Sequence, residues 1–293
     1  MKISDIRITT ICENTTARNF LLGEWGISFL VEAGHRKVLF DTGGGNTLLY
    51  NADKMGIDLS TIDSVVLSHG HQDHTGGLRP LLDRNHCRDP KRKVNIYTHP
   101  DALDGKYVQD KKKNVYYMGI LTVMEEIKRL GAEFITSTDV TRLEEDIIIS
   151  GEVPLANPYE KVSKAMVVKD ENGALQPDTL ADDLALYLKT EEGLVVVAGC
   201  AHRGIINTIK HGQEVTGLNQ VFMVIGGTHL FGVPEEQFSY TVEELKSMDV
   251  NLLGVSHCTG LKQAARLHHI FGEEKFFFNN AGTVIEFKGD QAV

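Results

Sequence analysis

A short segment rich in metal-ligand side chains constrains this chain more than any other feature. Residues 67–77 read LSHGHQDHTGG, so three histidines and one aspartate fall within six positions, directly after an apolar run. Imidazole nitrogens and carboxylate oxygens are ligands that zinc and similar metals bind. His69 and His71 alternate as ligands at a strand end do, whereas Asp73 and His74 stand where the chain turns towards a helix. The loop can offer two ligand pairs to two neighbouring ions; a metal-free, histidine-rich turn is the alternative.

The charge balance limits the classes of partner that this chain is expected to bind. The 293 residues are enough for a substantial core, and 30 basic against 40 acidic residues give a formal charge of −10. This balance argues against nucleic acid as a partner, because phosphate binding needs a basic surface. A small anionic substrate stays compatible with it, because metal ions supply local positive charge. The sequence carries no signal for an oligomeric state.

The expected compartment is the cytoplasm. The four cysteines are scattered and form no CxxC pair, so a disulfide framework is not expected. Residues 1–14 carry charges throughout and lack the continuous apolar core of a signal peptide. No apolar run approaches the ~20 residues that a transmembrane helix needs, so no membrane partner is expected.

Strands and helices are predicted to alternate through the first third of the chain. Apolar, β-branched runs predict strands at 3–11, 26–31, 37–40, 62–67 and 94–97. Helices are expected at 46–55 and 78–82. The strand at 37–40 ends in DTGGG, where either the backbone approaches another group closely beside Asp41 or a flexible turn is capped by Asp41. His99 precedes a proline and is interpreted as a turn residue, with a functional role as the alternative.

Two segments interrupt this alternation. Residues 106–118 are polar and lysine-rich, and are interpreted as a solvated loop or, because two tyrosines follow the lysines, as a lid over the site. Residues 151–183 contain three prolines and are expected to form an irregular excursion long enough to suspect function. Between them, residues 121–130 have helical spacing and end at Gly131, and strands are predicted at 133–135 and 146–149.

The second half repeats one pattern, in which an apolar strand precedes a histidine and small residues. After a strand at 184–189, strands at 194–198, 221–225 and 252–255 lead to His202, His229 and His257, and helices are expected at 205–209 and 261–271. In open α/β sheets ligands bind beyond the carboxyl ends of strands, so these ends can converge on one site. A catalytic metal commonly takes three protein ligands, which makes His202 and His257 the best candidates to complete the two pairs. His229 is interpreted as a donor that lines the site.

These motifs resemble the metallo-β-lactamase superfamily. The resemblance rests on FDTG at 40–43, HGHQDHTGG at 69–77 and the late His257, and covers nearly the whole chain. It implies a four-layer αββα sandwich, formed as one domain over 1–293 with irregular insertions near 104–120 and 151–183. It also implies two metals at one edge between the sheets, with His69 and His71 on the first and Asp73, His74 and His257 on the second. Two Zn²⁺ ions are expected, with Mn²⁺ or Fe²⁺ as alternatives.

One subgroup of this superfamily is especially similar, and one position departs from the wider pattern. GCAHRGI at 199–205, GGTHL at 226–230 and HCTG at 257–260 resemble members described as 7,8-dihydropterin-6-ylmethyl-4-(β-D-ribofuranosyl)aminobenzene-5'-phosphate synthases. Much of the superfamily has a Gly-Asp pair whose carboxylate bridges the metals, whereas Gly199 here precedes Cys200. Either Cys200 contributes a thiolate, or the bridge is missing and His202 completes the first site. We favour the second interpretation, because a free cysteine usually packs as a small hydrophobe.

The expected function is a metal-dependent hydrolase that uses metal-activated water on an ester, phosphodiester or similar small molecule. Asp73 would hold a metal and orient the nucleophile, and His229 would stabilise developing negative charge. The alternative is a pterin-transferring synthase that releases diphosphate, in which water takes no part. A second alternative is a metal-binding sensor without catalytic activity.

Overall fold

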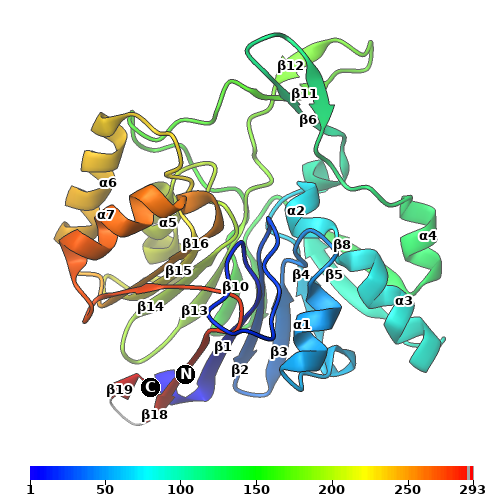
Figure 1. Ribbon diagram of the computed structural model, residues 1–293, viewed down its shortest axis with the longest axis horizontal. Coiled ribbons are helices and arrows are strands. Elements are labelled where there is room, and N and C mark those ends of the chain that lie inside the picture. The colour runs from blue at the N-terminus through cyan, green and yellow to red at the C-terminus, as the bar shows by residue number, and fades with distance from the viewer. Residues whose placement is uncertain (289–290, 293) are drawn as a thin grey trace.

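Two large sheets form the centre of the computed structural model, which describes residues 1–288 and 291–292 (Figure 1). The first sheet contains, in spatial order, β19 (Gln291–Ala292), β18 (Val284–Lys288), β1 (Ile6–Cys12), β2 (Ser28–Ala33), β3 (Arg36–Phe40), β4 (Ser64–Val66), β5 (Val94–Thr98) and β8 (Ala132–Thr136). The second contains β17 (Phe276–Phe278), β16 (Leu252–Ser256), β15 (Val221–Gly227), β14 (Leu194–Ala198), β13 (Ala185–Lys189), β10 (Ile147–Ile149) and β9 (Thr141–Glu144).

Helices cover the outer faces of both sheets (Figure 1). The first sheet carries α1 (Leu48–Lys54), α3 (Leu78–Arg88) and α4 (Met124–Arg129). The second carries α5 (Ile205–Thr216), α6 (Glu235–Ser247) and α7 (Leu261–Phe271). Short turns of helix lie at η1 (Ile3–Asp5), η2 (Leu59–Thr61), α2 (Gln72–Thr75), η3 (Pro100–Leu103) and η4 (His257–Thr259). No helix among the residues that the structure describes is long and apolar enough to cross a bilayer.

Side-chain alternation along the strands produces the four layers. Successive strand residues face opposite sides of a sheet, so a fully apolar strand can serve two cores. In β14, Val195 and Val197 pack in the core between the sheets, whereas Val196 packs in the core under α5, α6 and α7. In β4, Val66 joins the core between the sheets, and Val65 joins the core under α1, α3 and α4. The result is the expected αββα sandwich.

Parallel strand pairing brings the site-bearing loops to one edge. In the first sheet β3, β4, β5 and β8 are parallel neighbours, and in the second β14, β15, β16 and β17 are parallel neighbours. Their carboxyl ends therefore meet at a common edge of each sheet, with helices returning the chain to the other end. In Figure 1 the short α2, which follows β4, lies at this edge, far from the amino terminus.

Most predicted elements are present, with shifted ends. The predicted helix at 261–271 coincides with α7, whereas α3 and α5 continue past the predicted 78–82 and 205–209. The predictions end too early because polar residues dominate the later turns of both helices, and the apolar pattern gives no signal there. The predicted strand at 3–11 begins as η1, and the helix predicted from 121 begins at Met124, leaving Leu121 67% exposed. Helix α6 and strands β9, β17, β18 and β19 are outside the predicted elements.

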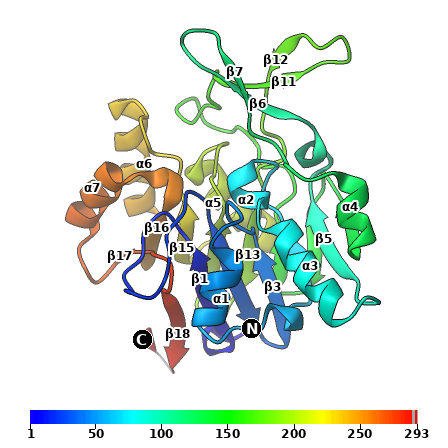
Figure 2. The same ribbon diagram turned by 45° about the vertical axis from the view of Figure 1, so that its right-hand side comes forward.

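The two interrupting segments differ from the expected solvated loop and irregular excursion. They supply β6 (Lys106–Gln109), β7 (Val115–Tyr117), β11 (Met166–Lys169) and β12 (Leu175–Pro177), which form an antiparallel four-stranded sheet in the order β12-β11-β6-β7. This sheet stands apart from the two large ones, above the site-bearing edge (Figure 2). The pairing joins Met166 to Val108, which are distant in sequence, so no local pattern signals it. That residues 106–118 form a lid over the site, and that the chain is a single domain, stay predictions.

A buried ion-pair network connects this small sheet to the loop after β4. Lys106 is 1% exposed, and its Nζ lies 3.1 Å from Asp178 Oδ2 and 2.9 Å from Asp182 Oδ1. The other Asp182 oxygen accepts a hydrogen bond from Gly70 N at 2.9 Å. Burial lowers the pKa of Lys106, but Asp182 and Asp178 raise it more, so its net pKa lies above the ordinary value. A charged Lys106 thus helps to fix the backbone between His69 and His71.

Lys106→Met should destabilise the protein strongly, because it leaves Asp178 and Asp182 buried without their cation. We expect the free energy of unfolding, measured by urea denaturation, to fall by about 3–5 kcal/mol. Lys112→Met, at the exposed tip of the same hairpin, is the matched control and should change it by less than about 0.5 kcal/mol. Equal losses in the two variants would contradict a specific role for the buried network.

Candidate metal centre

Two glycine-rich loops pack directly against each other at the end of β3 and β4. Thr42 N donates to His74 O at 2.7 Å, and Gly76 N donates to Gly43 O at 3.0 Å. A Cβ at Gly77 would collide with the carbonyl oxygen of Thr42, so this contact requires glycine. Of the two interpretations of DTGGG, close backbone approach is therefore the one realised. The group approached is the loop that carries the predicted ligands.

His69, His71 and His202 form the first ligand set. His69 Nε2 lies 2.9 Å from His71 Nδ1 and 3.2 Å from His202 Nε2, and all three side chains are buried. Three ring nitrogens thus converge on one point from the end of β4 and the end of β14. This agrees with the interpretation in which His202 completes the set begun by the loop.

Asp73, His74 and His257 form the second ligand set, beside the first. Asp73 Oδ2 lies 3.3 Å from His257 Nε2 and 3.8 Å from His74 Nε2. The two sets touch through their rings, because the His69 and His74 centroids are 4.1 Å apart. All six predicted ligand residues are therefore brought together, in the two groups that the sequence suggested.

Hydrogen bonds fix which nitrogen of each ring faces the centre. Asp41 Oδ2 accepts from His74 Nδ1 at 2.7 Å and from the Ser68 hydroxyl at 2.7 Å. Because Ser68 donates to Asp41, its oxygen can accept from His69 Nδ1, which lies 2.9 Å away. Asn14 Oδ1 lies 2.9 Å from His257 Nδ1 and plays the same part there. In these three rings Nδ1 is occupied, which directs Nε2 towards the centre, whereas His71 turns its Nδ1 towards His69 Nε2.

The electrostatics of the two sets suit a cation. Burial lowers the pKa of His69 and His202 well below the ordinary value and that of His71 to about 4, so these rings stay neutral, as metal ligands must. Burial also lowers the pKa of His74, but Asp41 and Asp73 raise it more, to about 9. The second set thus attracts one positive charge, which a metal ion can supply in place of a proton.

An unpartnered buried atom supports the same conclusion. Asp73 Oδ1, on the carboxylate of the second set, is buried without a hydrogen-bond partner. Burial raises the pKa of Asp73, but His74 and His257 lower it more, so Asp73 is an ionised carboxylate with a free oxygen. An unpaired buried acceptor of this kind is costly unless a ligand, a water or an ion completes it.

Cys200 and His229 border both ligand sets. Cys200 Sγ lies 3.2 Å from His74 Nε2, and it is within ligand distance of residues of either set. Burial and the neighbouring Cys258 raise the pKa of the Cys200 thiol well above its ordinary value, which favours the uncharged form. His229 lies beside His202, with ring centroids 4.2 Å apart, and its Nδ1 has no partner. His229 lines a cavity beside His202, and its role as a donor stays a prediction.

Sequence reasoning missed several residues that shape the site. Glu13 accepts a hydrogen bond from His257 N at 2.7 Å, and Asn14 orients the ring of His257. Nothing local distinguishes these two polar residues after β1. Cys258 Sγ, 3.3 Å from the Cys200 carbonyl oxygen, could have been noticed beside His257. His99 lies apart from both ligand sets, accepts from Asp101 N and faces Glu152, so it acts as a turn residue.

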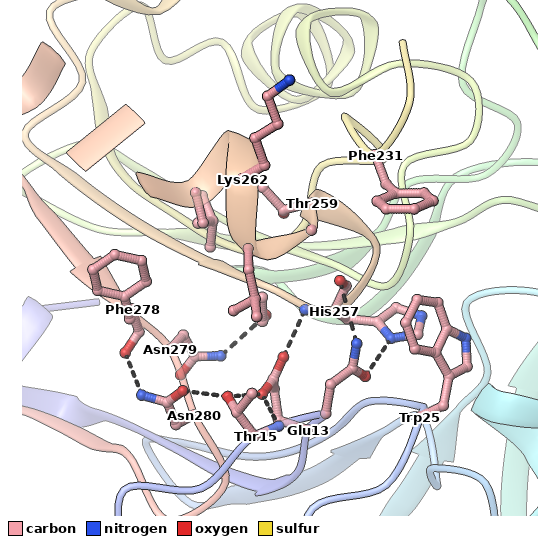
Figure 3. Close-up of a pocket in the computed structure, with 16 residues that line it drawn as sticks. Glu13, Thr15, Trp25, Phe231, His257, Thr259, Lys262, Phe278, Asn279 and Asn280 are labelled. Atoms are coloured by element: carbon pink, nitrogen blue, oxygen red, sulfur yellow. Dashed lines mark hydrogen bonds between the residues drawn. The ribbon is translucent and has the colours of Figure 1, made fainter. Parts of the chain in front are cut away.

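Two cavities open beside the ligand sets. One, of about 440 Å³, is lined by His257 and by aromatic side chains (Figure 3). The other, of about 230 Å³, is lined by His202, His229 and the exposed Lys161. Phe231 lines both cavities, so it separates them. A small molecule could reach either ligand set from these openings.

Comparisons with known proteins show which proteins this chain is similar to. Residues 26–171 match the family model of the metallo-beta-lactamase superfamily. The chain is 31% identical to a 7,8-dihydropterin-6-methyl-4-(beta-D-ribofuranosyl)-aminobenzene-5'-phosphate synthase of Methanocaldococcus jannaschii, over 98% of each chain. The crystal structure of Tm1679, a metal-dependent hydrolase of the beta-lactamase superfamily, superposes with a TM-score of 0.81 at 29% identity, over 97% of this chain and 99% of that one. The fold also matches YhfI of Bacillus subtilis, with a TM-score of 0.56 at 13% identity, over 95% and 98% of the two chains.

Removing one ligand from each set should separate the two sites. We expect wild-type protein loaded with Zn²⁺ and desalted to hold about two ions per chain by mass spectrometry of the metal, and His202→Ala or His257→Ala to hold about one. His35→Ala, which changes a side chain that is 81% exposed, is the control and should hold as many as the wild type. If His202→Ala kept both ions, His202 would not be a ligand.

Asp41→Asn should weaken metal binding without removing a ligand, because the amide no longer accepts two strong hydrogen bonds and loses its hold on His74. We expect the affinity, measured by competition with a chromogenic chelator, to fall by about 10- to 100-fold. Asp53→Asn alters an exposed surface carboxylate that pairs with Arg84 and serves as the control. An unchanged affinity in Asp41→Asn would show that packing alone holds the rings.

Proposed function

Because the chain belongs to the metallo-β-lactamase superfamily, we propose that it is a metal-dependent hydrolase acting on an ester, phosphodiester or similar small molecule. The observation that carries this proposal is the pair of adjoining three-residue ligand sets at one edge of the two sheets. Their five imidazoles and single carboxylate are a donor set typical of zinc, with Mn²⁺ or Fe²⁺ as alternatives.

Each set has its own role in holding metal. His69, His71 and His202 would hold one ion, and Asp73, His74 and His257 the other. Bound ions of this kind supply Lewis acidity, which lowers the pKa of water towards ~7 and polarises a carbonyl or phosphoryl oxygen. The chain contributes the fixed orientation of the ligands, through hydrogen bonds that the distal ring nitrogens donate to Asp41, Ser68 and Asn14.

In the proposed reaction Asp73 and His229 would handle protons and charge. Asp73 Oδ1 is buried and unpartnered, so it can accept a hydrogen bond from a water molecule and orient that water for attack. His229 Nδ1 is likewise unpartnered beside the first set. Burial lowers the pKa of His229, but its contact with Cys258 raises it more, which favours a ring able to donate to developing negative charge.

Pterin transfer is the second candidate, and one observation favours it. The relative that is 31% identical over 98% of both chains is a synthase whose product joins a dihydropterin to an aminobenzene ring. In such a reaction the cationic centre would neutralise a diphosphate leaving group, and the acceptor amine would replace water. The two cavities on either side of Phe231 give room for two reactants. A metal-binding sensor remains the third candidate.

One experiment separates the candidates. Zn²⁺-loaded protein should hydrolyse at least one member of a panel of phosphodiesters, lactones, thioesters and 6-hydroxymethyl-7,8-dihydropterin diphosphate with water alone, followed by product release. Asp73→Ala should lower that rate by about 10²- to 10⁴-fold while the circular dichroism spectrum stays unchanged. Asp83→Ala, on the surface of α3, is the matched control and should keep the rate.

Two other outcomes would contradict the hydrolase proposal. Diphosphate release that requires 4-(β-D-ribofuranosyl)aminobenzene-5'-phosphate would replace hydrolysis by pterin transfer. No turnover of any panel member, with or without this acceptor and with full metal content, would leave the sensor function.

A further inference from the structure

An aromatic-walled cavity opens beside the second ligand set and is lined, apart from His257, by residues that belong to neither set. It has a volume of about 440 Å³, within the range of small-molecule sites. Among the residues that the structure describes, four phenylalanine or tryptophan side chains are exposed: Phe20, Trp25, Phe231 and Phe278. All but Phe20 line this one cavity. Three exposed apolar rings around one opening are typical of a binding site, whereas the exposed tyrosines Tyr50, Tyr116, Tyr117 and Tyr159 lie outside the cavity.

The three rings are held in place by the fold. Trp25 lies against His257 of the second ligand set, with ring centroids 5.0 Å apart. Phe278, at the end of β17, packs edge-on against Phe276 with centroids 5.1 Å apart. Phe231 donates its backbone N–H to Cys258 O at 3.1 Å. Figure 3 shows Trp25 and Phe231 on one side of the cavity and Phe278 on the other. Because the rings are pre-positioned, a ligand would not have to order them.

The polar floor of the cavity is already satisfied. Glu13 accepts from Thr15 N, the Thr15 hydroxyl and His257 N, and Asn280 Nδ2 donates to Phe278 O (Figure 3). Asn279 bonds the hydroxyls of Thr10 and Ser256. These groups hold the walls together and leave a ligand few free donors or acceptors apart from the exposed Lys262, which also lines the cavity (Figure 3). Recognition here therefore depends on the faces and edges of the aromatic rings.

We propose that this cavity binds a flat, conjugated ring of the substrate, with Trp25, Phe231 and Phe278 as its contact surface. Rings offer both area and favourable stacking geometry to such walls, whereas an aliphatic group gains area alone. Given the metal-dependent reaction proposed above, a ring held beside His257 places its substituent at the second ligand set. The smaller cavity on the far side of Phe231 presents Lys161 and His229, which suit an anionic part of the same molecule.

Ring binding can be measured without turnover. The probes are 7,8-dihydropterin, a bicyclic ring, and 4-aminobenzyl alcohol, a single ring, each titrated into Zn²⁺-loaded protein by calorimetry; cyclohexylmethanol is the non-aromatic comparison. Trp25 is the only tryptophan of the chain, so its emission reports on the cavity directly in variants of the other two rings. The variants are Trp25→Ala, Phe231→Ala and Phe278→Ala, with Trp25→Phe as the conservative change.

At least one ring probe should bind, and each alanine variant should weaken its binding by about 5- to 100-fold. Trp25→Phe should restore most of the affinity. Phe20→Ala, an exposed ring on the Trp25 loop outside the cavity, should leave the affinity and metal content unchanged. The bicyclic and single rings compete for the same walls, so their relative affinities identify which part of a substrate occupies the cavity.

Two results would overturn the inference: neither ring probe binding more tightly than cyclohexylmethanol to protein with full metal content, or the alanine variants having the same ring affinity as Phe20→Ala. Failure of the proposed function would give a different combination of results. Ring binding that is lost in the alanine variants, together with no turnover in any assay, would keep the aromatic site and reject the hydrolase.

Discussion

The carboxylate of Asp41 is the contact on which the site most depends. It is fully buried, it accepts hydrogen bonds from Ser68 N, the Ser68 hydroxyl and His74 Nδ1 at 2.7 Å each, and it sits where β3 ends. Through Ser68 it also reaches His69, so a single carboxylate orients one ring of each ligand set. In a dry environment such charge-assisted bonds are strong and directional, which is why the two sets can be held only a few ångströms apart.

The backbone is strained around the same place. Seven non-glycine residues with positive φ occur among the residues that the structure describes, and four of them follow strands at this edge: Asp41, Ala201, His229 and His257. Such conformations cost about 1–3 kcal/mol each and persist only where the surroundings enforce them. Here the enforcing contacts are visible, since Glu13 binds the backbone of His257 and Asp41 is bonded from two sides. The sandwich cores supply the stability that offsets this strain.

Binding surfaces are added to this centre by parts of the chain outside the repeated strand–helix pattern. The small sheet is tied to the ligand loop through Lys106, Asp182 and Gly70, so its position and that of His69 and His71 are linked. The loop before β2 brings Trp25 against His257, and the loop after β15 brings Phe231 between the two cavities. The sheets therefore determine where a reaction can occur, while these segments determine which molecules can approach.

The sequence by itself determined the fold class and the six ligand candidates. Buried parallel strands are continuous apolar runs, and ligands that leave one strand end are neighbours in the chain, so both leave local signals at residues such as His69 and Asp73. The aromatic cavity, the buried Lys106 network and the orienting contacts of Glu13 and Asn14 were decided only by the tertiary structure. Each joins residues far apart in the chain, such as Trp25 with His257 or Lys106 with Asp182. Periodicity reports which face of an element is buried, but not which distant element covers it, and that pairing is what shapes the pocket.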